Sequence, residues 1–279
     1  MKTYKFNDGN KIPQLGLGTF LNTDVDILKN TLTKAFELGY RHIDTAQGYN
    51  NEAIIGDIIK DSGLNIKNLF ITTKIKCHET PEQLKISLEE SFLNLQTDFI
   101  DLVLIHWPSH DYKLNYQTYQ VLEEYKDEGK IGSIGVSNFT IDHLKELLKV
   151  CKYKPVINQV ELHPNLTQEP MQTFLKQNDI AIGSYGQFMK GQVFEGSNKE
   201  VLERVATKYN ATIAQIVIAW GLARNIIMIP MSTNEKNLET NLLAKDIVLN
   251  KEDIDLINGL NKGRRVYTDP ENNNIFMKR

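Results

Sequence analysis

The residue types that could carry acid–base chemistry stand where short apolar runs of this sequence end. Asp44 lies in the run HIDTA, Lys74 ends LFITTK, and His106 follows LVLI. An ammonium group that leaves water must find an anion or a function, because burial of an unpaired charge costs several kcal/mol. Asp44 is the nearest plausible anion for Lys74, either within an active site or as a purely structural ion pair.

Tyr49 follows Asp44 by five residues and is within reach of the same pocket. A neighbouring ammonium favours the ionised phenol, so we expect Lys74 to lower the pKa of Tyr49 from its ordinary value of about 10. Such a tyrosine can donate or accept a proton near neutral pH. A neutral His106 imidazole would hydrogen-bond a bound carbonyl oxygen. These groups can protonate an oxygen while another molecule delivers electrons, which points to hydride transfer from a cofactor.

The sequence gives little support for hydrolysis. No serine has a base at a suggestive spacing, and no HxH or HExxH cluster occurs, so we expect neither a nucleophile nor a metal ion. Each polar residue taken alone would be an ordinary core or loop side chain. Their number favours a site, because four more polar residues end or lie within the later runs: Ser137, Asn138, Gln159 and Tyr185.

Eight short apolar runs alternate with longer amphipathic segments and predict eight strands with helices between them. Dividing 279 residues by eight gives about 35 per unit, enough for a strand, a crossover helix and two loops. The predicted strands are residues 14–17, 42–46, 69–74, 102–107, 133–137, 156–162, 181–185 and 226–229. The predicted helices are residues 24–38, 52–61, 81–95, 116–128, 141–149, 169–177, 199–208, 213–224 and 235–243.

Boundary residues agree with this alternation. Thr80 and Pro81 predict a capped helix start, while Gly39 and Gly129 follow helical runs as candidate C-terminal caps. An open doubly wound sheet is the competing fold, but it would normally carry GxGxxG after its first strand. This chain has GLGT there and no Walker A loop. We therefore predict a (β/α)8 TIM barrel, as one domain over residues 1–279, with function at the carboxyl ends of its strands.

The composition is that of an ordinary globular protein, with 41% hydrophobic residues, 24% charged residues and a net charge of −3. So small a net charge provides no overall electrostatic attraction to nucleic acid or to anionic membranes, and we expect neither as a partner. No run reaches the roughly 18 apolar residues of a membrane helix. Cys77 and Cys151 are too few for a disulfide framework, so we expect reduced thiols in the cytoplasm. We also expect a monomer.

Several of these segments resemble the aldo-keto reductases. The matching motifs, in chain order, are GYRHIDTAQGYNNEAIIG over residues 39–56, ITTK, DLVLIHWP, IGVSNF and NQVELHP. The later segments KYNATIAQIVIAW and IPMSTNEKNLETNLL are most similar to the bacterial branch that includes 2,5-diketo-D-gluconate reductases and methylglyoxal-reducing enzymes. The resemblance implies a (β/α)8 barrel with an extended nicotinamide dinucleotide across the carboxyl-end rim.

The resemblance also implies a role for each polar residue. Tyr49 would be the general acid, and Lys74 would lower its pKa. Asp44 would pair with Lys74, while His106 would orient the carbonyl. Phe20 and Trp107 would be walls of the substrate pocket, with simple packing as the alternative.

The expected cofactor contacts lie along the same rim. Ser137, Asn138 and Gln159 match the positions that hold the nicotinamide carboxamide, and Tyr185 matches the aromatic residue that stacks on the ring. The remaining matches are Gly18 and Thr19 near the ribose, and Ser232 and Asn241 near the phosphate and adenine.

One departure from the family pattern affects the choice of cofactor. Many relatives have a lysine and an arginine that grip the 2′-phosphate of NADPH, and here Met231 and Asn237 stand at those positions. Lys236 is the only cation nearby, and Glu235 opposes it. Loss of charge-assisted contacts of about 1.5–3 kcal/mol each weakens discrimination for NADPH. We expect NADPH as the cofactor and keep NADH as the alternative.

A second departure follows Tyr185, where residues 186–189 replace the usual Ser-Pro-Leu turn. In relatives this loop helps to cover the pyrophosphate, so loop closure and cofactor release are the properties it would change. The tail over residues 263–279 corresponds to a segment that often borders the substrate pocket.

The leading hypothesis is an NAD(P)H-dependent reductase of small aldehydes or ketones, including α-dicarbonyls and keto sugars. The alternative is a nucleotide-binding redox sensor that acts through a protein partner. A barrel hydrolase or isomerase that shares the rim residues is a third, but no paired-carboxylate or metal signature supports it.

Overall fold

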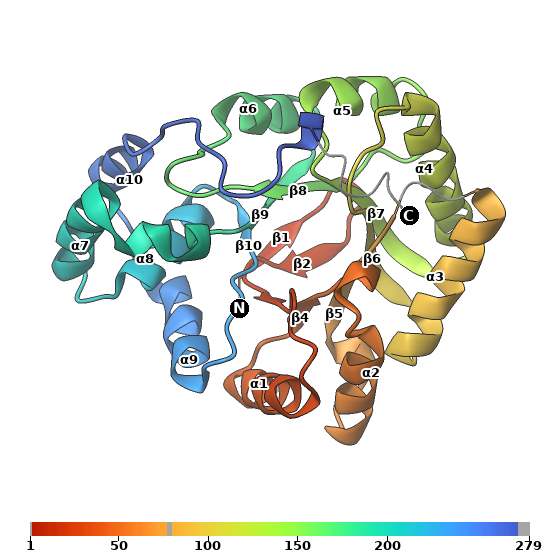
Figure 1. The fold of residues 1–279 in the computed structure, drawn as a ribbon, viewed down its shortest axis with the longest axis horizontal. Helices are drawn as coiled ribbons and strands as arrows, with labels where there is room; N and C mark the ends of the chain where they lie inside the picture. The colour runs from red at the N-terminus through yellow and green to blue at the C-terminus, as the bar shows by residue number, and fades with distance from the viewer. Residues whose placement is uncertain (1, 77–79, 273–279) are drawn as a thin grey trace.

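The computed structural model describes residues 2–76 and 80–272, which form a closed barrel of parallel strands (Figure 1). Cys77 and the tail beyond Asn272 lie outside the described residues. Backbone bridges join Leu15 to Met228 and Gly18 to Met231, so the last strand returns to the first. The predicted (β/α)8 barrel is confirmed. Its strands are β3 (Leu17–Gly18), β4 (His42–Asp44), β5 (Phe70–Ile75), β6 (Ile100–Ile105), β7 (Ile131–Ser137), β8 (Ile157–Glu161), β9 (Ala181–Tyr185) and β10 (Ile227–Met228).

The register of these strands brings their polar carboxyl ends level with one another. Each strand pairs in parallel with its neighbours in chain order, so residues at successive strand ends become cross-strand neighbours. The paired positions include Gly18 with Asp44, Ser137 with Gln159, and Glu161 with Tyr185. The rim predicted from the strand ends is therefore a single edge of the barrel.

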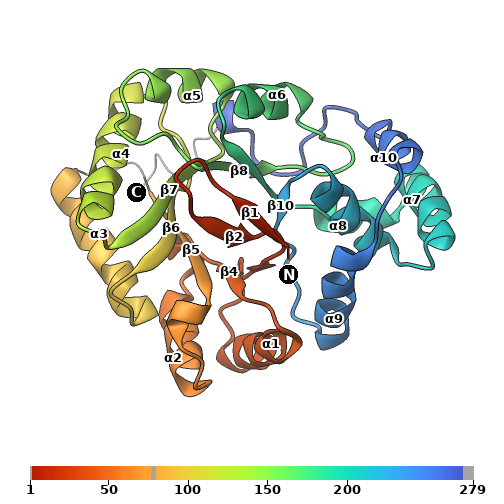
Figure 2. The ribbon, with the colours of Figure 1, turned by 180° about the vertical axis from the view of Figure 1, so that it is seen from behind.

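Helices surround the barrel, as the two opposite views show (Figures 1 and 2). Four of the predicted helices, over residues 52–61, 81–95, 169–177 and 235–243, have the predicted bounds. The helix over residues 251–258 was not predicted, because its eight residues carry only a short apolar pattern. The helices are α1 (Val25–Leu38), α2 (Glu52–Asp61), α3 (Pro81–Leu95), α4 (Tyr112–Asp127), α5 (Ile141–Leu148), α6 (Glu169–Gln177), α7 (Gly196–Lys208), α8 (Ile213–Ala223), α9 (Glu235–Leu243) and α10 (Lys251–Asn258).

The caps predicted from the sequence are present. Thr80 and Gln83 form a reciprocal capping box at the start of α3, with Pro81 in the first turn. Gly39 ends α1 with a φ of 97°, and Gly129 follows α4 with a φ of 73°. Both glycines occupy the left-handed region that other residues adopt only under strain.

An N-terminal hairpin covers the other end of the barrel. Strands β1 (Thr3–Lys5) and β2 (Lys11–Pro13) pair antiparallel, and Figure 2 shows them lying across the barrel strands. Phe6 and Ile12 from this hairpin belong to a buried cluster with Phe70 and Val156, which lie near the starts of β5 and β8. The hairpin was not predicted, since neither three-residue strand contains an apolar run.

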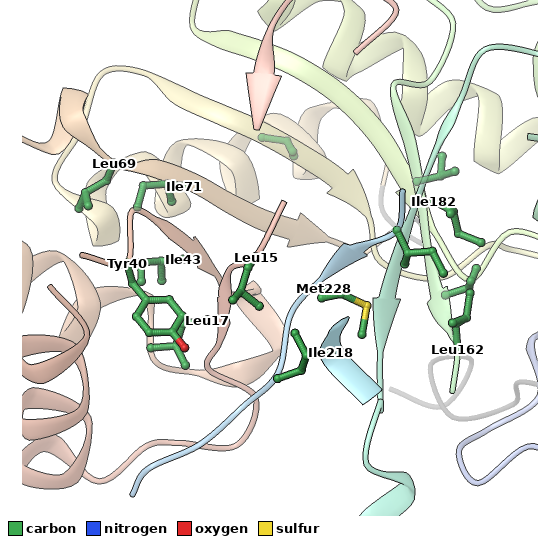
Figure 3. Packing of buried hydrophobic residues seen from close by; sticks show 14 of the residues in the cluster. Leu15, Leu17, Tyr40, Ile43, Leu69, Ile71, Leu162, Ile182, Ile218 and Met228 are labelled. Carbon is green, nitrogen blue, oxygen red and sulfur yellow. The ribbon is translucent and has the colours of Figure 1, made fainter. Parts of the chain in front are cut away.

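The larger hydrophobic core fills the layer between strands and helices. Figure 3 shows part of it, where Leu15 and Met228 lie near Ile218 of α8. Trp220 is fully buried on α8 and its Nε1 donates a hydrogen bond of 2.9 Å to Asn258 of α10. This bond ties the unpredicted helix to the core. Among the described residues, no helix is both long enough and apolar enough to cross a membrane.

Candidate active site

A buried ion pair lies at the centre of the carboxyl-end rim. Lys74 of β5 is 1% exposed, and its Nζ lies 2.5 Å from Asp44 Oδ1 and 2.9 Å from the carbonyl oxygen of Thr45. Burial lowers the pKa of Lys74, but the Asp44 carboxylate and the Tyr49 oxygen outweigh burial and hold this pKa above its ordinary value. Lys74 therefore carries its charge inside the protein at neutral pH.

The phenol of Tyr49 faces this ion pair from the 3-10 helix η1 (Gln47–Tyr49). Its hydroxyl lies 3.4 Å from Lys74 Nζ, which sits 5.0 Å from the centre of the tyrosine ring. Burial raises the pKa of Tyr49; Lys74 lowers it by less, and Asp44 offsets part of the lysine's effect. The expectation that the pKa of Tyr49 falls below its ordinary value is therefore wrong. The phenol keeps its proton at neutral pH, so it is a donor rather than a base.

Two aromatic rings hold Tyr49 in place. The ring of Phe20 lies 5.0 Å from the ring of Tyr49 at 75°, and the ring of His106 lies 5.6 Å away at 77°, so both contacts are edge-to-face. Burial and the charges of Lys74 and Lys76 lower the pKa of His106 to about 3. The imidazole is therefore neutral at any ordinary pH and can donate one hydrogen bond. Trp107, the next residue, is half-buried.

A hydrogen-bonded network extends the site along β7, β8 and β9. Gln159 donates to the second carboxylate oxygen of Asp44 at 2.7 Å, and Ser137 donates to the backbone oxygen of Gln159 at 2.8 Å. Asn138 donates to the backbone oxygen of His106 at 3.0 Å. Tyr185 donates to Asn138 Oδ1 at 2.6 Å, and burial raises the pKa of Tyr185. These hydrogen bonds fix the side chains relative to the ion pair.

The residues at the start of the barrel reach the same centre. Thr19 donates through both its backbone N–H, at 3.0 Å, and its hydroxyl, at 3.1 Å, to the backbone oxygen of Asp44. Gly18 lies beside Met231 through the bridge that closes the barrel. A Cβ at Gly18 would lie 3.1 Å from the backbone oxygen of Ile229, so this position favours glycine.

The expected adenosine end of the site lies beyond this bridge and is more open. Met231 is 47% exposed, Ser232 is half-buried, and Asn237 is exposed on α9. Asn241 of the same helix is buried. Gln159 is hydrogen-bonded directly to Asp44 of the ion pair. Among the residues that the structure describes, these four side chains have no such hydrogen bond to Asp44 or Lys74.

Asn51 is a site residue that sequence reasoning missed. It is fully buried, donates to the backbone oxygens of Thr19 at 2.8 Å and Asn22 at 3.0 Å, and accepts from the Thr45 hydroxyl at 2.7 Å. It thereby joins the loop that carries Phe20 to the loop that carries Tyr49. Its only signal in the sequence was a polar residue two places after Tyr49.

Glu161 is a second residue without a predicted role, although it lies in the motif NQVELHP. It ends β8 and is fully buried, and it contacts the backbone of the C-terminal tail. A cavity of about 260 Å³ lies next to this tail, beside Asn138 and Arg265. Neither Tyr49 nor Lys74 lines that cavity, so it is separate from the ion pair.

The loop after β9 is compact despite its unusual sequence. Gly186 adopts a φ of 69°, and Gln187 is buried and donates to the backbone oxygen of Ser184 at 2.5 Å. The chain then enters the 3-10 segment η3 (Met189–Phe194). Over residues 2–76 and 80–272, no group of three histidine, cysteine or acidic residues could hold a metal ion.

Comparison with known proteins assigns the family. The model of the aldo/keto reductase family matches residues 14–262. The chain is 39% identical over 271 residues to the glyoxal reductase of Bacillus subtilis, covering 96% of each protein. It is 40% identical over 260 residues to the methylglyoxal reductase DkgB of Escherichia coli O157:H7, covering 92% of this chain and 96% of DkgB.

Solved structures agree with the sequence comparisons. The silkworm Bombyx mori aldo-keto reductase complexed with NADPH superposes with a TM-score of 0.89 at 29% identity, over 96% of this chain and 90% of that one. The resemblance to the bacterial branch is confirmed by its glyoxal and methylglyoxal reductases. The chain therefore belongs to the aldo/keto reductase family and is an oxidoreductase that reduces carbonyl groups with a nicotinamide cofactor.

Proposed function

We propose that this enzyme reduces small α-oxoaldehydes with NADPH, and that Tyr49 supplies the proton. The observation that carries the proposal is the 3.4 Å contact between the Tyr49 hydroxyl and Lys74 Nζ, with the lysine paired to Asp44 and the His106 ring alongside. The two curated relatives named above reduce glyoxal and methylglyoxal, according to their names. Other small aldehydes, ketones and keto sugars are the wider substrate class.

Each residue contributes one part of the chemistry. Tyr49 keeps its proton in the resting site and releases it to the carbonyl oxygen during reduction. The Lys74 ammonium stabilises the phenolate that develops as the proton leaves. Asp44 keeps Lys74 charged. A nicotinamide held at this rim would supply the hydride to the carbonyl carbon, so that the carbonyl becomes an alcohol and the cofactor is oxidised.

His106 acts on the carbonyl oxygen from another side. Its neutral imidazole can donate a hydrogen bond, whereas an imidazolium beside Lys74 would bring a second positive charge into the pocket. A donor aimed at the oxygen on which charge develops lowers the barrier without being consumed. Phe20 and Trp107 are the proposed walls that keep water from this oxygen.

The rim residues fit the carboxamide end of a nicotinamide. A primary carboxamide has both donors and an acceptor, and the amides of Asn138 and Gln159 with the hydroxyl of Ser137 offer the complementary groups. The Tyr185 ring offers an aromatic face. We assign these four residues to the nicotinamide, Gly18 and Thr19 to the ribose, and Ser232 and Asn241 to the phosphate and adenine.

NADPH is the proposed cofactor, with NADH as the alternative. The NADPH-bound silkworm structure supports NADPH. The preference for NADPH over NADH should be weak, because Met231 and Asn237 carry no charge and Glu235 opposes the charge of Lys236.

We also propose that the enzyme is a monomer with a single barrel domain over residues 1–279, and that it works in the cytoplasm. A free Cys151 thiol fits that compartment.

A direct assay tests the function. The purified protein is mixed with NADPH and methylglyoxal, glyoxal or a larger aldehyde, and oxidation of NADPH is followed by its near-ultraviolet absorbance. We expect the fastest turnover with the α-oxoaldehydes, and slower turnover when NADH replaces NADPH. Tight nucleotide binding with no turnover of any carbonyl would favour the redox-sensor alternative.

A further inference from the structure

A buried carboxylate fixes the start of the C-terminal tail. Oε1 of Glu161 accepts hydrogen bonds from the backbone N–H groups of Val266, at 2.6 Å, and Tyr267, at 3.2 Å. Arg265 Nη1 lies 3.7 Å from the other oxygen of Glu161, which is fully buried. His163 Nε2 lies 3.0 Å from Oε1. The tail is therefore held at residues 265–267, far in sequence from the strand that holds it.

This anchor places the Tyr267 ring against the end of β9. The rings of Tyr267 and Tyr185 are 5.6 Å apart at 82°, an edge-to-face contact. A Cβ on Gly186 would lie 2.6 Å from the Tyr267 ring, so the ring occupies the space that a larger residue would need. Lys190 Nζ lies 4.8 Å from the centre of the same ring. Tyr267 thus touches the strand end and the loop that follows it.

Tyr185 connects this contact to the rest of the site. Its hydroxyl donates to Asn138 at 2.6 Å, and Asn138 donates to the backbone oxygen of His106. The hydroxyl end of Tyr185 is fixed by Asn138, but one hydrogen bond does not set the rotation of the ring plane. Tyr267 makes an edge-to-face contact with the ring itself, and this contact bears on the ring plane.

We propose that Tyr267 is a positioning residue that sets the plane of Tyr185 for stacking on the nicotinamide, with Glu161 as its anchor. This inference rests on the proposed function, in which Tyr185 is the stacking residue. Tyr267 acts through its ring and not through its hydroxyl. The C-terminal tail therefore contributes to NADPH affinity through Tyr267, in addition to any contact that it makes with substrate.

The test compares Tyr267→Ala with Tyr267→Phe in the full chain. We expect Tyr267→Ala to weaken NADPH binding about 3- to 10-fold, because the cofactor must then order the Tyr185 ring as it binds, and Tyr267→Phe to bind within about twofold of the wild type. Binding is measured by quenching of protein fluorescence. Adenosine bisphosphate, the NADPH fragment without nicotinamide, should bind both variants equally, because Tyr185 contacts only the nicotinamide end.

Two controls separate this role from a structural one. Tyr153→Ala removes a tyrosine that also packs against lysines, away from the predicted site, and should leave NADPH binding unchanged. The thermal unfolding midpoint of the cofactor-free Tyr267→Ala protein should fall by only about 2–4 °C, as expected for the loss of one aromatic contact. Equal loss of binding for NADPH and for adenosine bisphosphate would overturn the inference, as would unchanged NADPH binding by Tyr267→Ala.

The anchor gives an independent readout. Glu161→Ala should weaken NADPH binding as Tyr267→Ala does, and the double variant should lose no more than either single one, because both act through the same ring. Should Glu161→Ala fail to fold, the two Tyr267 variants still decide the question. If the wild type bound no NADPH, both the proposed function and this inference would be wrong. If the wild type reduces methylglyoxal, the proposed function stands, and the Tyr267 variants then test only the role of Tyr267.

Discussion

The two ends of the proposed cofactor site are built differently. At the reaction centre, Lys74 is 1% exposed and is bonded to Asp44, which in turn accepts from Gln159. At the proposed adenosine end, Met231 is 47% exposed and precedes α9, which begins with Glu235 and Lys236. The buried end can hardly change without loss of the reaction or of stability. The open end can exchange single side chains, so cofactor preference can vary while the chemistry stays constant.

Removal of the Tyr49 hydroxyl should have the largest effect. We expect Tyr49→Phe to lower turnover by a factor of about 10² to 10⁴, because the proton donor is lost while the ring contacts with Phe20 and His106 remain. NADPH affinity should be unchanged. The measurement is the reductase assay with binding by fluorescence, and Tyr153→Phe is the matched control. A Tyr49→Phe enzyme with most of its rate would mean that another group is the acid.

Removal of Lys74 should damage both activity and stability. Lys74→Met leaves the Asp44 carboxylate buried without its cation, which typically costs about 3–5 kcal/mol in the free energy of unfolding. Turnover should fall nearly as far as in Tyr49→Phe. Urea denaturation measures the stability. The control is Lys85→Met, which breaks an exposed 2.7 Å pair with Glu124 and should cost less than about 1 kcal/mol. If both variants lost the same free energy of unfolding, the buried ion pair would be no more important to stability than the exposed one.

Acidification should destabilise the buried end. Burial lowers the pKa of His106 to about 3 and that of His42 to about 4, from an ordinary value of 6.5. The unfolded chain therefore binds protons that the folded chain does not, so the free energy of unfolding should fall as the pH drops from about 6.5 toward 4. The comparison is urea denaturation over this range with wild type and His106→Asn. The free energy of unfolding of His106→Asn should fall less steeply with decreasing pH than that of the wild type. Identical slopes would mean that burial does not lower the pKa of His106.

A charge added at the open end should have the smallest effect. We expect Met231→Lys to tighten NADPH by about 3- to 10-fold more than NADH, because an exposed ammonium gains only a screened contact with the 2′-phosphate. The ratio of the two dissociation constants is the measurement. Val248→Lys adds the same charge at an exposed position between α9 and α10 and should leave the ratio unchanged. Equal tightening of both cofactors by Met231→Lys would place the 2′-phosphate elsewhere.

Sequence reasoning grouped the residues of the proposed reaction centre because strand ends obey a simple rule. Parallel strands in chain order bring their carboxyl ends to one rim, so Asp44, Lys74 and His106 had to be close once the barrel was recognised. The direction of the Tyr49 pKa could not be read in the same way. It depends on how deeply the phenol is buried, and burial depth is a property of the packed structure.

The contacts that escaped prediction join distant parts of the chain. Glu161 and Val266 are 105 residues apart, and no periodic pattern connects them. Asn51 bonds to backbone groups of another loop, which any polar side chain of suitable length could do. The short β1 and β2 hairpin lacks an apolar run, and only its position under the barrel explains why Phe6 and Ile12 are buried.

The closure of the barrel has a consequence for how the enzyme comes into being. Strands β3 and β10 are two residues each, and they meet across a seam whose sides are more than 200 residues apart in the chain. Asp44, Tyr49 and Lys74 all lie within the first 75 residues, so the chain carries all three early in synthesis. Gly18 and Met231 become neighbours only when the final strand docks. The proposed proton donor is therefore present in the chain long before the proposed dinucleotide site can close.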